Sequence, residues 1–288
     1  MIPPSFDYHA PTTLPDALKL LGQFGDEAKI LSGGQSLLPL LKLRMAAPGH
    51  VVDIGRIPGL DYIKEDGGFL KIGALVREAE IEASKLVREK YPILVDTASV
   101  VADPLVRNLA TLAGNLAHGD PANDHPATML ALGASVVATG PKGERVIAIS
   151  DFFTGLFTTA LEPNEILTEI RIPVPPARSG GSYVKLERKV GDFAIAGAAA
   201  FVVLDAGGAV ERAGIGLTNV GLVPVKADKA EQHLKGRKAD AIAEAARLAA
   251  DGVSPEPDRR GTTEYKKEMT RVLTARALQK AYARAGGR

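Results

Sequence analysis

Two segments of the chain combine glycine with small polar side chains, the residue types with which a backbone can bind an anion. The first is Ser32-Gly33-Gly34-Gln35-Ser36. Glycines allow close approach to a ligand, and successive N–H groups ahead of a helix can hold a pyrophosphate. The segment matches neither the Walker pattern nor the Rossmann fingerprint. By itself it is weak evidence, because an isolated Gly-Gly pair is more often a plain tight turn.

The second segment, residues 107–126, is rich in small polar groups although apolar runs flank it. Each polar group buried without a partner costs about 1–3 kcal/mol, so the segment is either a surface loop or a binding site. Asp120 and Asp124 could form an acid pair, but turn-forming and helix-capping aspartates are far more common. We therefore assign no catalytic residue.

Composition excludes several other kinds of site. The chain has 288 residues, with 35 Lys and Arg against 34 Asp and Glu, and no cysteine. The balanced charge gives no global positive field for a nucleic acid or an anionic membrane. Without cysteine, the chain itself carries no thiolate nucleophile, disulfide, Cys-ligated zinc or iron–sulfur cluster. The histidines show no metal-type spacing, so no metal site is predicted.

The chain also lacks an evident membrane or export signal. No basic region followed by an apolar one opens the sequence, and the longest apolar run, residues 195–204, is too short to span a bilayer. We expect a cytoplasmic protein with no transmembrane segment.

The elements expected around the two segments are mixed. A helix is predicted from Thr13, which precedes an acidic first turn, and a strand at 28–31 runs into the first glycine segment, followed by a short helix at 37–43. Alternation predicts two hairpins, 60–64 with 69–74 and 134–139 with 145–149. Helical patterns cover 77–101 and 126–132, whereas 111–124 shows no regular pattern.

The second half reads as a separate unit. Residues 173–181, rich in proline and glycine, are typical of an interdomain connection. We place the boundary there, giving domains 1–176 and 177–288. Beyond it, strands are predicted at 182–189, 196–204 and 210–217, and helices at 239–250 and 263–285. The fold class is α+β.

Taken together, segments 32–36, 111–115 and 119–126 resemble the FAD-binding medium subunits of molybdenum hydroxylases, the xanthine dehydrogenase family, and within it the carbon monoxide dehydrogenase type. The resemblance extends over the whole chain, from Met1-Ile2-Pro3 through Glu165-Ile166-Leu167 to residues 185–194. It implies a vanillyl-alcohol-oxidase or PCMH-type FAD-binding domain of two subdomains, followed by a C-terminal domain with a three-stranded antiparallel sheet and a helical bundle.

The resemblance also implies cofactor-binding positions. Residues 29–37 would wrap the pyrophosphate and adenine side of FAD, 111–115 would meet the pyrophosphate and ribityl region, and Asp124 would accept a hydrogen bond from a flavin hydroxyl. Two positions depart from the family pattern: Gln35 replaces a frequent histidine, and Ala113 a usual glycine, which is tolerable if its φ is negative. The complete set is Lys29, Ile30, Leu31, Ser32, Gly33, Gly34, Gln35, Ser36, Leu37, Val101, Thr111, Leu112, Ala113, Gly114, Asn115, Asp124, Leu167, Lys185, Asp192 and Phe193.

Four of these positions are implied to surround the isoalloxazine ring. Val101 would pack near it, Leu167 would contact its edge, Lys185 would place positive charge beside it, and Phe193 would shield one face. Because the flavin carries the redox chemistry, the protein needs no acid or base of its own there.

The family further implies a small partner subunit with two [2Fe–2S] clusters and a large one with molybdenum and its pterin cofactor, in a dimer of heterotrimers. Electrons would pass from the clusters to FAD and on to an outside acceptor, by resemblance a quinone, with the complex peripheral at the inner face of the membrane. The alternatives are a related xanthine, aldehyde or N-heterocycle dehydrogenase, a free-standing FAD oxidoreductase, and a nucleotide-binding regulatory module. The substrate itself is selected on another subunit.

Overall fold

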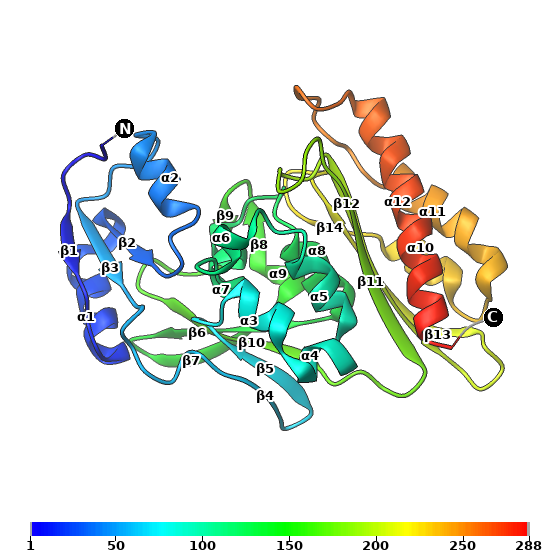
Figure 1. The fold of residues 1–288 in the computed structure, drawn as a ribbon, viewed down its shortest axis with the longest axis horizontal. Coiled ribbons are helices and arrows are strands. Elements are labelled where there is room, and N and C mark those ends of the chain that lie inside the picture. The colour runs from blue at the N-terminus through cyan, green and yellow to red at the C-terminus, as the bar shows by residue number, and fades with distance from the viewer. Residues whose placement is uncertain (1, 287–288) are drawn as a thin grey trace.

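The computed structural model describes residues 2–286 and contains three main sheets that follow one another along the longest axis of the molecule (Figure 1). The first sheet is parallel, with strand order β1-β3-β2. Thr13 caps the first helix by accepting a hydrogen bond from Asp16 N–H, as the sequence predicted. The elements of this subdomain are β1 Asp7–His9, α1 Leu14–Phe24, a 3₁₀ turn Gly25–Glu27, β2 Ala28–Leu31, α2 Leu37–Lys42 and β3 His50–Asp53.

The second sheet has five strands in the order β4-β5-β10-β6-β7. Its two outer pairs, β4–β5 and β6–β7, confirm the two predicted hairpins. Strand β10 joins them, antiparallel to both neighbours. The bounds are β4 Ile63–Asp66, β5 Phe69–Gly73, β6 Ser135–Gly140, β7 Gly143–Ala148 and β10 Ile166–Pro173, with a small separate pair, β8 Phe153–Gly155 and β9 Thr158–Thr159.

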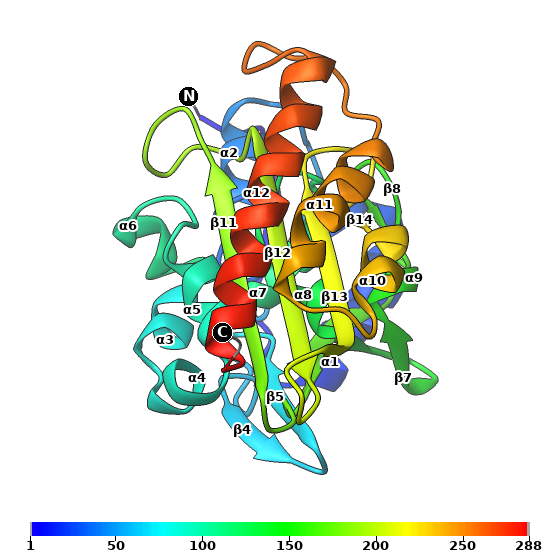
Figure 2. The ribbon, with the colours of Figure 1, turned by 90° about the vertical axis from the view of Figure 1, so that its right-hand side faces the viewer.

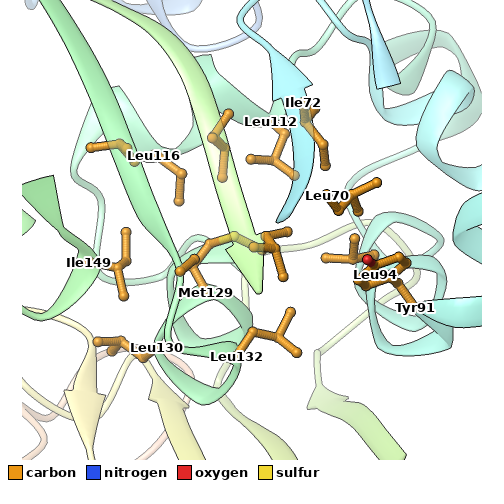
Figure 3. Close-up of a cluster of buried hydrophobic side chains, with 14 of the residues drawn as sticks. Leu70, Ile72, Tyr91, Leu94, Leu112, Leu116, Met129, Leu130, Leu132 and Ile149 are labelled. Carbon is orange, nitrogen blue, oxygen red and sulfur yellow. The ribbon is translucent and has the colours of Figure 1, made fainter. Parts of the chain in front are cut away.

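Short helices pack against this sheet and enclose the main core, to which Leu112, Leu116, Met129 and Leu130 belong (Figure 3). The predicted helical stretch 77–101 is broken into three helices, because Ser84 is extended and Pro92 begins a new helix. The bounds are α3 Glu78–Ala83, α4 Lys85–Lys90, α5 Pro92–Ala98, α6 Pro104–Arg107, α7 Leu112–His118, α8 His125–Leu132 and α9 Ile149–Phe152.

The polar stretch 111–124 differs from its sequence interpretation. Its first half is helix α7, and only residues 119–124 are irregular. Thr111 starts the helix by accepting a hydrogen bond from Gly114 N–H at 3.1 Å, and Gly119 ends it with φ of 68°. Leucines 112 and 116 bury one side of this helix, but small residues between them hide the helical pattern in the sequence.

The C-terminal sheet carries α10, α11 and α12 on one face, with α12 running along β11 and β12 (Figure 2). The resemblance implied three antiparallel strands; three long strands are present, and β14 adds two residues at the edge. The bounds are β11 Ser179–Leu186, β12 Ala196–Leu204, β13 Val210–Thr218, β14 Val225–Lys226, α10 Asp228–Leu234, a 3₁₀ turn Ala239–Ala241, α11 Ile242–Asp251 and α12 Thr263–Arg284.

The connection between the two halves is shorter than predicted. Strand β10 ends at Pro173 and β11 begins at Ser179, so only residues 174–178 are irregular. Gly180 belongs to β11, where a Cβ would lie 2.2 Å from the carbonyl oxygen of Ala281 in α12. It therefore serves close packing rather than flexibility. The proposed domain boundary after residue 176 falls in this connection.

The other face of the C-terminal sheet packs on α8, a helix in which every residue is buried. A Cβ at Gly214 or Gly216 would lie 2.0 Å from a carbonyl oxygen of α8, so these glycines of β13 let the helix approach the strand. Arg284 in α12 adds an ion pair with Asp96 in α5 at 2.5 Å. Helix α8 is thereby packed closely on β13, and α12 is tied to α5.

Candidate functional site

The two glycine-containing segments, far apart in the sequence, are in contact. Ser32 Oγ lies 3.1 Å from Thr111 Oγ1. A Cβ on Gly33 would lie 2.2 Å from the carbonyl oxygen of Leu109 and 2.9 Å from Cα of Ala110. We call these five residues the loop contact. Glycine is needed at position 33 because a side chain there would collide with the backbone of Leu109 and Ala110.

The rest of the first segment is fixed by its backbone. Gly34 has φ of 74°, a conformation that favours glycine. Gln35 Nε2 donates to the carbonyl oxygen of Gly33 at 3.1 Å, and Ser36 is the residue before α2, which begins at Leu37. The preceding positions form β2, in which Lys29 is exposed while Ile30 and Leu31 are half-buried.

The second segment presents the start of α7. Leu112 and Ala113 are buried, and Ala113 lies in the helix with negative φ, so its methyl group causes no backbone strain. The carbonyl oxygen of Asn115 accepts from Asn123 Nδ2 at 2.7 Å. Within residues 2–286, the buried Oδ1 of Asn115 has no hydrogen-bond partner. A buried acceptor of this kind normally has a donor.

Asp124 and Lys185 form a buried ion pair between the two halves of the chain. Lys185 Nζ lies 3.0 Å from Asp124 Oδ2 and 3.3 Å from Glu187, and it donates to the carbonyl oxygen of Val100 at 2.9 Å. Tyr183 donates its hydroxyl to Asp124 Oδ1 at 2.6 Å. We call Asp124, Tyr183, Lys185 and Glu187 the charge network.

Burial dominates the electrostatics of this network. It raises the pKa of the Asp124 carboxyl, against the opposing effects of Lys185 and the Tyr183 hydroxyl. Burial also raises the pKa of the Tyr183 phenol well above its usual value, and the neighbouring Asp124 charge adds to this. Nζ of Lys185 therefore faces two carboxyl groups of the chain itself, those of Asp124 and Glu187.

A third group of predicted residues lies where residues 100–102 meet the turn after β11. Gly191 has φ of 81°, and a Cβ there would lie 2.8 Å from the carbonyl oxygen of Ala102. Val101 is buried and the side chain of Phe193 is half-exposed. The Arg260 guanidinium donates to Asp192 at 2.9 Å and holds the pKa of that carboxyl below its usual value.

Leu167 lies apart from all three groups. It lies in β10 opposite Ala138 and belongs to the main core, with 5% of its surface exposed. Among the described residues, no cluster of three or more His, Asp or Glu side chains could hold a metal ion. The structure thus places Ser32, Gly33 and Thr111 in the loop contact, Asp124 and Lys185 in the charge network, and Asp192 and Phe193 in the turn after β11. The other predicted positions of the two glycine-containing segments lie next to the loop contact along the chain.

Comparisons with known proteins match both halves of the chain. Residues 4–175 match the family model described as the FAD binding domain in molybdopterin dehydrogenase. The chain belongs to this family. Residues 181–281 match the CO dehydrogenase flavoprotein C-terminal domain. The resemblance inferred from the sequence, and the fold class that it implied, are confirmed.

Individual relatives cover the chain from end to end. The carbon monoxide dehydrogenase medium chain of Afipia carboxidovorans is 45% identical over 99% of both chains. The 6-hydroxypseudooxynicotine dehydrogenase complex subunit alpha of Paenarthrobacter nicotinovorans is 39% identical over 99% of this chain and 97% of its own. In the solved carbon monoxide dehydrogenase of Hydrogenophaga pseudoflava, a chain 45% identical matches with a TM-score of 0.96, covering 99% of each.

The residues present fit the FAD of this family. The unpartnered Asn115 Oδ1 suits a hydroxyl or N–H donor such as a flavin dinucleotide carries. The helices α2 and α7 both begin beside the loop contact, and a helix N-terminus favours an anion such as a diphosphate, although the N–H groups of Leu38 and Gly114 already donate to Gly34 and Thr111. Bound FAD would supply the redox chemistry, and the protein binding and orientation.

Sequence reasoning missed several residues that shape this site. Tyr183 lies two residues before Lys185 on the same strand, so strand alternation could have placed both on one face. Leu109, Gly191 and Arg260 gave no local signal, because each acts on a segment distant in the sequence. The hydrogen-bonding capacity of Asp124, in turn, is partly taken by the protein itself.

Proposed function

We propose that this chain is the FAD-carrying electron-transfer subunit of a molybdenum-containing hydroxylase of the carbon monoxide dehydrogenase type. The observation that carries the proposal is the whole-length likeness to a carbon monoxide dehydrogenase medium chain, at 45% identity. The contact between Ser32 and Thr111 supports it, because it places both glycine-containing segments at one site. The chain is therefore an oxidoreductase subunit.

In this proposal, different cofactor-binding residues hold different parts of FAD. The backbone of residues 29–37 and 111–115 binds the diphosphate side and the ribityl chain. Asp124, which keeps lone pairs beyond those used by Tyr183 and Lys185, accepts a flavin hydroxyl. Val101, Leu167, Lys185 and Phe193 surround the ring, and Asp192 belongs to the same turn as Phe193.

The partners follow from what the chain lacks and what it resembles. With no cysteine, it cannot itself supply the thiolates of an iron–sulfur cluster. The proposal places two [2Fe–2S] clusters on a small subunit and the molybdenum pterin cofactor on a large one, in a dimer of heterotrimers. A quinone is the proposed acceptor, reached by a complex peripheral to the inner face of the membrane. Within residues 2–286, no helix is long and apolar enough to cross a bilayer.

A second candidate is the flavin subunit of a related dehydrogenase that oxidises a xanthine, an aldehyde or an N-heterocycle. The 39% identity to the 6-hydroxypseudooxynicotine dehydrogenase subunit favours it. A free-standing flavin enzyme would need a substrate-facing base or arginine. The nearby Arg107 is instead engaged with Glu82 and the carbonyl oxygens of Val101 and Ala102.

Purification from the native host tests the assignment. The tagged chain should co-purify with two partner chains, with one FAD per chain and with stoichiometric iron and molybdenum. Dye reduction should depend on carbon monoxide. Dependence on a purine, an aldehyde or an N-heterocycle instead selects the second candidate. Flavin without partners, iron or molybdenum selects the free-standing enzyme, and absence of flavin overturns the proposal.

Asn115 offers a sharper test of the binding site. Its Oδ1 has no protein partner among residues 2–286, so Asn115→Leu removes no hydrogen bond made by that atom in the apoprotein. We expect this variant to lose FAD while the melting temperature of the flavin-free chain stays near that of the wild type. Full flavin content in Asn115→Leu would remove this residue from the proposed site.

A further inference from the structure

A buried pair of polar side chains lies outside the positions assigned above. Nε2 of His125 is 2.7 Å from Oε2 of Glu78, and both side chains are fully buried. Within residues 2–286, neither Oε1 of Glu78 nor Nδ1 of His125 has a hydrogen-bond partner. Among the described residues, the bond between Nε2 and Oε2 is therefore the one hydrogen bond that these two side chains make.

On one side, the pair is attached to the loop contact. Glu78 is the first residue of α3, and its backbone N–H donates to the carbonyl oxygen of Ala110 at 2.9 Å. The neighbouring Arg77 pairs with Thr111 as a β-bridge, and its guanidinium donates to the carbonyl oxygen of Leu109 at 3.1 Å. The beginning of α3 thus holds the segment against which Gly33 packs.

On the other side, the pair is attached to the charge network. His125 is the first residue of α8 and follows Asp124 directly. Any rotation or shift at the start of this helix moves the Asp124 carboxylate relative to Lys185. A hydrogen bond fixes direction and distance, whereas an apolar contact at the same place tolerates small shifts.

We propose that Glu78 and His125 are a positioning pair that sets the loop contact and the charge network at the separation that bound FAD requires. This inference rests on the proposed function, since it takes both groups as binding one ligand. In this proposal, neither Glu78 nor His125 touches the cofactor. Each acts through its neighbours, Glu78 through Ala110 and His125 through Asp124.

The test compares Glu78→Leu with the conservative Glu78→Gln in the complex purified from its host. A glutamine amide can accept from or donate to Nε2 of His125, so it retains a hydrogen bond in either ring tautomer. Thr128→Val is the matched control. Thr128 is a fully buried residue of the same helix, and its Oγ1 lies 2.7 Å from Thr97 Oγ1; neither threonine belongs to the loop contact or the charge network.

Three quantities are measured: the FAD dissociation constant, the visible circular dichroism of bound flavin, and the melting temperature of the flavin-free protein. Because a shift of either group weakens its contacts with the shared ligand, we expect Glu78→Leu to raise the FAD dissociation constant by about tenfold. It should also change the dichroism of the remaining flavin. Glu78→Gln should stay close to wild type in both, and Thr128→Val should lower the melting temperature alone.

The outcomes separate this inference from the proposed function. If the wild-type complex holds FAD and Glu78→Leu holds it equally tightly, the positioning role is wrong and the proposed function stands. The role is also wrong if FAD binding falls in Glu78→Leu and Thr128→Val alike, in step with their melting temperatures. A wild-type complex without FAD overturns both.

Discussion

The loop contact and the charge network, which we propose to bind one FAD, are built in opposite ways. The loop contact depends on the lack of a side chain at Gly33, where a Cβ would lie 2.2 Å from a carbonyl oxygen. The charge network depends on atoms that are present and charged, with Asp124 and Lys185 buried 3.0 Å apart. One region is therefore sensitive to added volume, and the other to an unbalanced charge.

The two regions also differ in how much of the chain they need. The loop contact is complete within residues 32–111, all of which precede the connection to the C-terminal half. The charge network joins the start of α8 to β11, so it forms only when the C-terminal sheet is docked.

Removal of one charge from the network should have the largest effect on stability. Lys185→Met leaves the Asp124 carboxylate buried without its ammonium partner, which typically costs about 3–5 kcal/mol. We expect a loss of this size in the free energy of unfolding, measured with urea. Asp124→Asn combined with Lys185→Met should recover part of it, because the uncompensated charge is gone. A double variant as unstable as the single one would show that charge balance is not what the network provides.

Added volume at Gly33 should have the second-largest effect on stability. Gly33→Val forces the backbone of Leu109 and Ala110 away, and overpacking of this kind costs about 1–3 kcal/mol. We expect most FAD to be lost on desalting, measured by flavin absorbance per chain. Gly22→Val is the control, since a Cβ at Gly22 has nothing within 4 Å. Equal flavin retention in both variants would contradict the loop contact.

Hydroxyl removal in the loop contact should have a graded effect. Thr111→Ala loses both the cap of α7 and the bond to Ser32, and loss of a cap alone costs about 1 kcal/mol. Ser32→Ala loses only the second bond and should cost less. Urea unfolding of the two single variants and the double variant measures the coupling. Strictly additive losses would mean that the 3.1 Å contact between the hydroxyls contributes nothing.

The sequence was most informative where one local pattern determined the structure. The Thr13 cap, strand β2 and both hairpins were predicted from residues next to one another. It was less informative where both faces of an element are covered. Strand β10 buries Thr168 and Glu169 along with its apolar residues, so it lacks the alternation by which a half-exposed strand is recognised.

The candidate site shows the same limit. Its glycine-containing segments were identified from composition and the remaining positions from resemblance. The contacts of these residues could not be predicted, because their partners are distant in the chain. Tyr183 lies 59 residues from Asp124, and Arg260 lies 68 residues from Asp192. The sequence indicated that Gly33 allows close approach, but only the structure shows that it approaches Leu109.

The smallest predicted effect concerns pH and the turn at Asp192. Because Arg260 holds the pKa of Asp192 below that of an unfolded aspartate, the stabilisation is complete above the unfolded value, about 3.9, and is lost as the pH falls through the folded value. The pair is partly exposed, so its contribution should be under about 1 kcal/mol. The difference in melting temperature between wild type and Asp192→Asn should therefore be constant above about pH 5 and shrink below about pH 4. The corresponding difference for Ser32→Ala should not change over this range, because the loop contact contains no titratable side chain. A pH-independent difference for Asp192→Asn would show that charge does not stabilise this turn, so that it would resemble the loop contact and not the charge network.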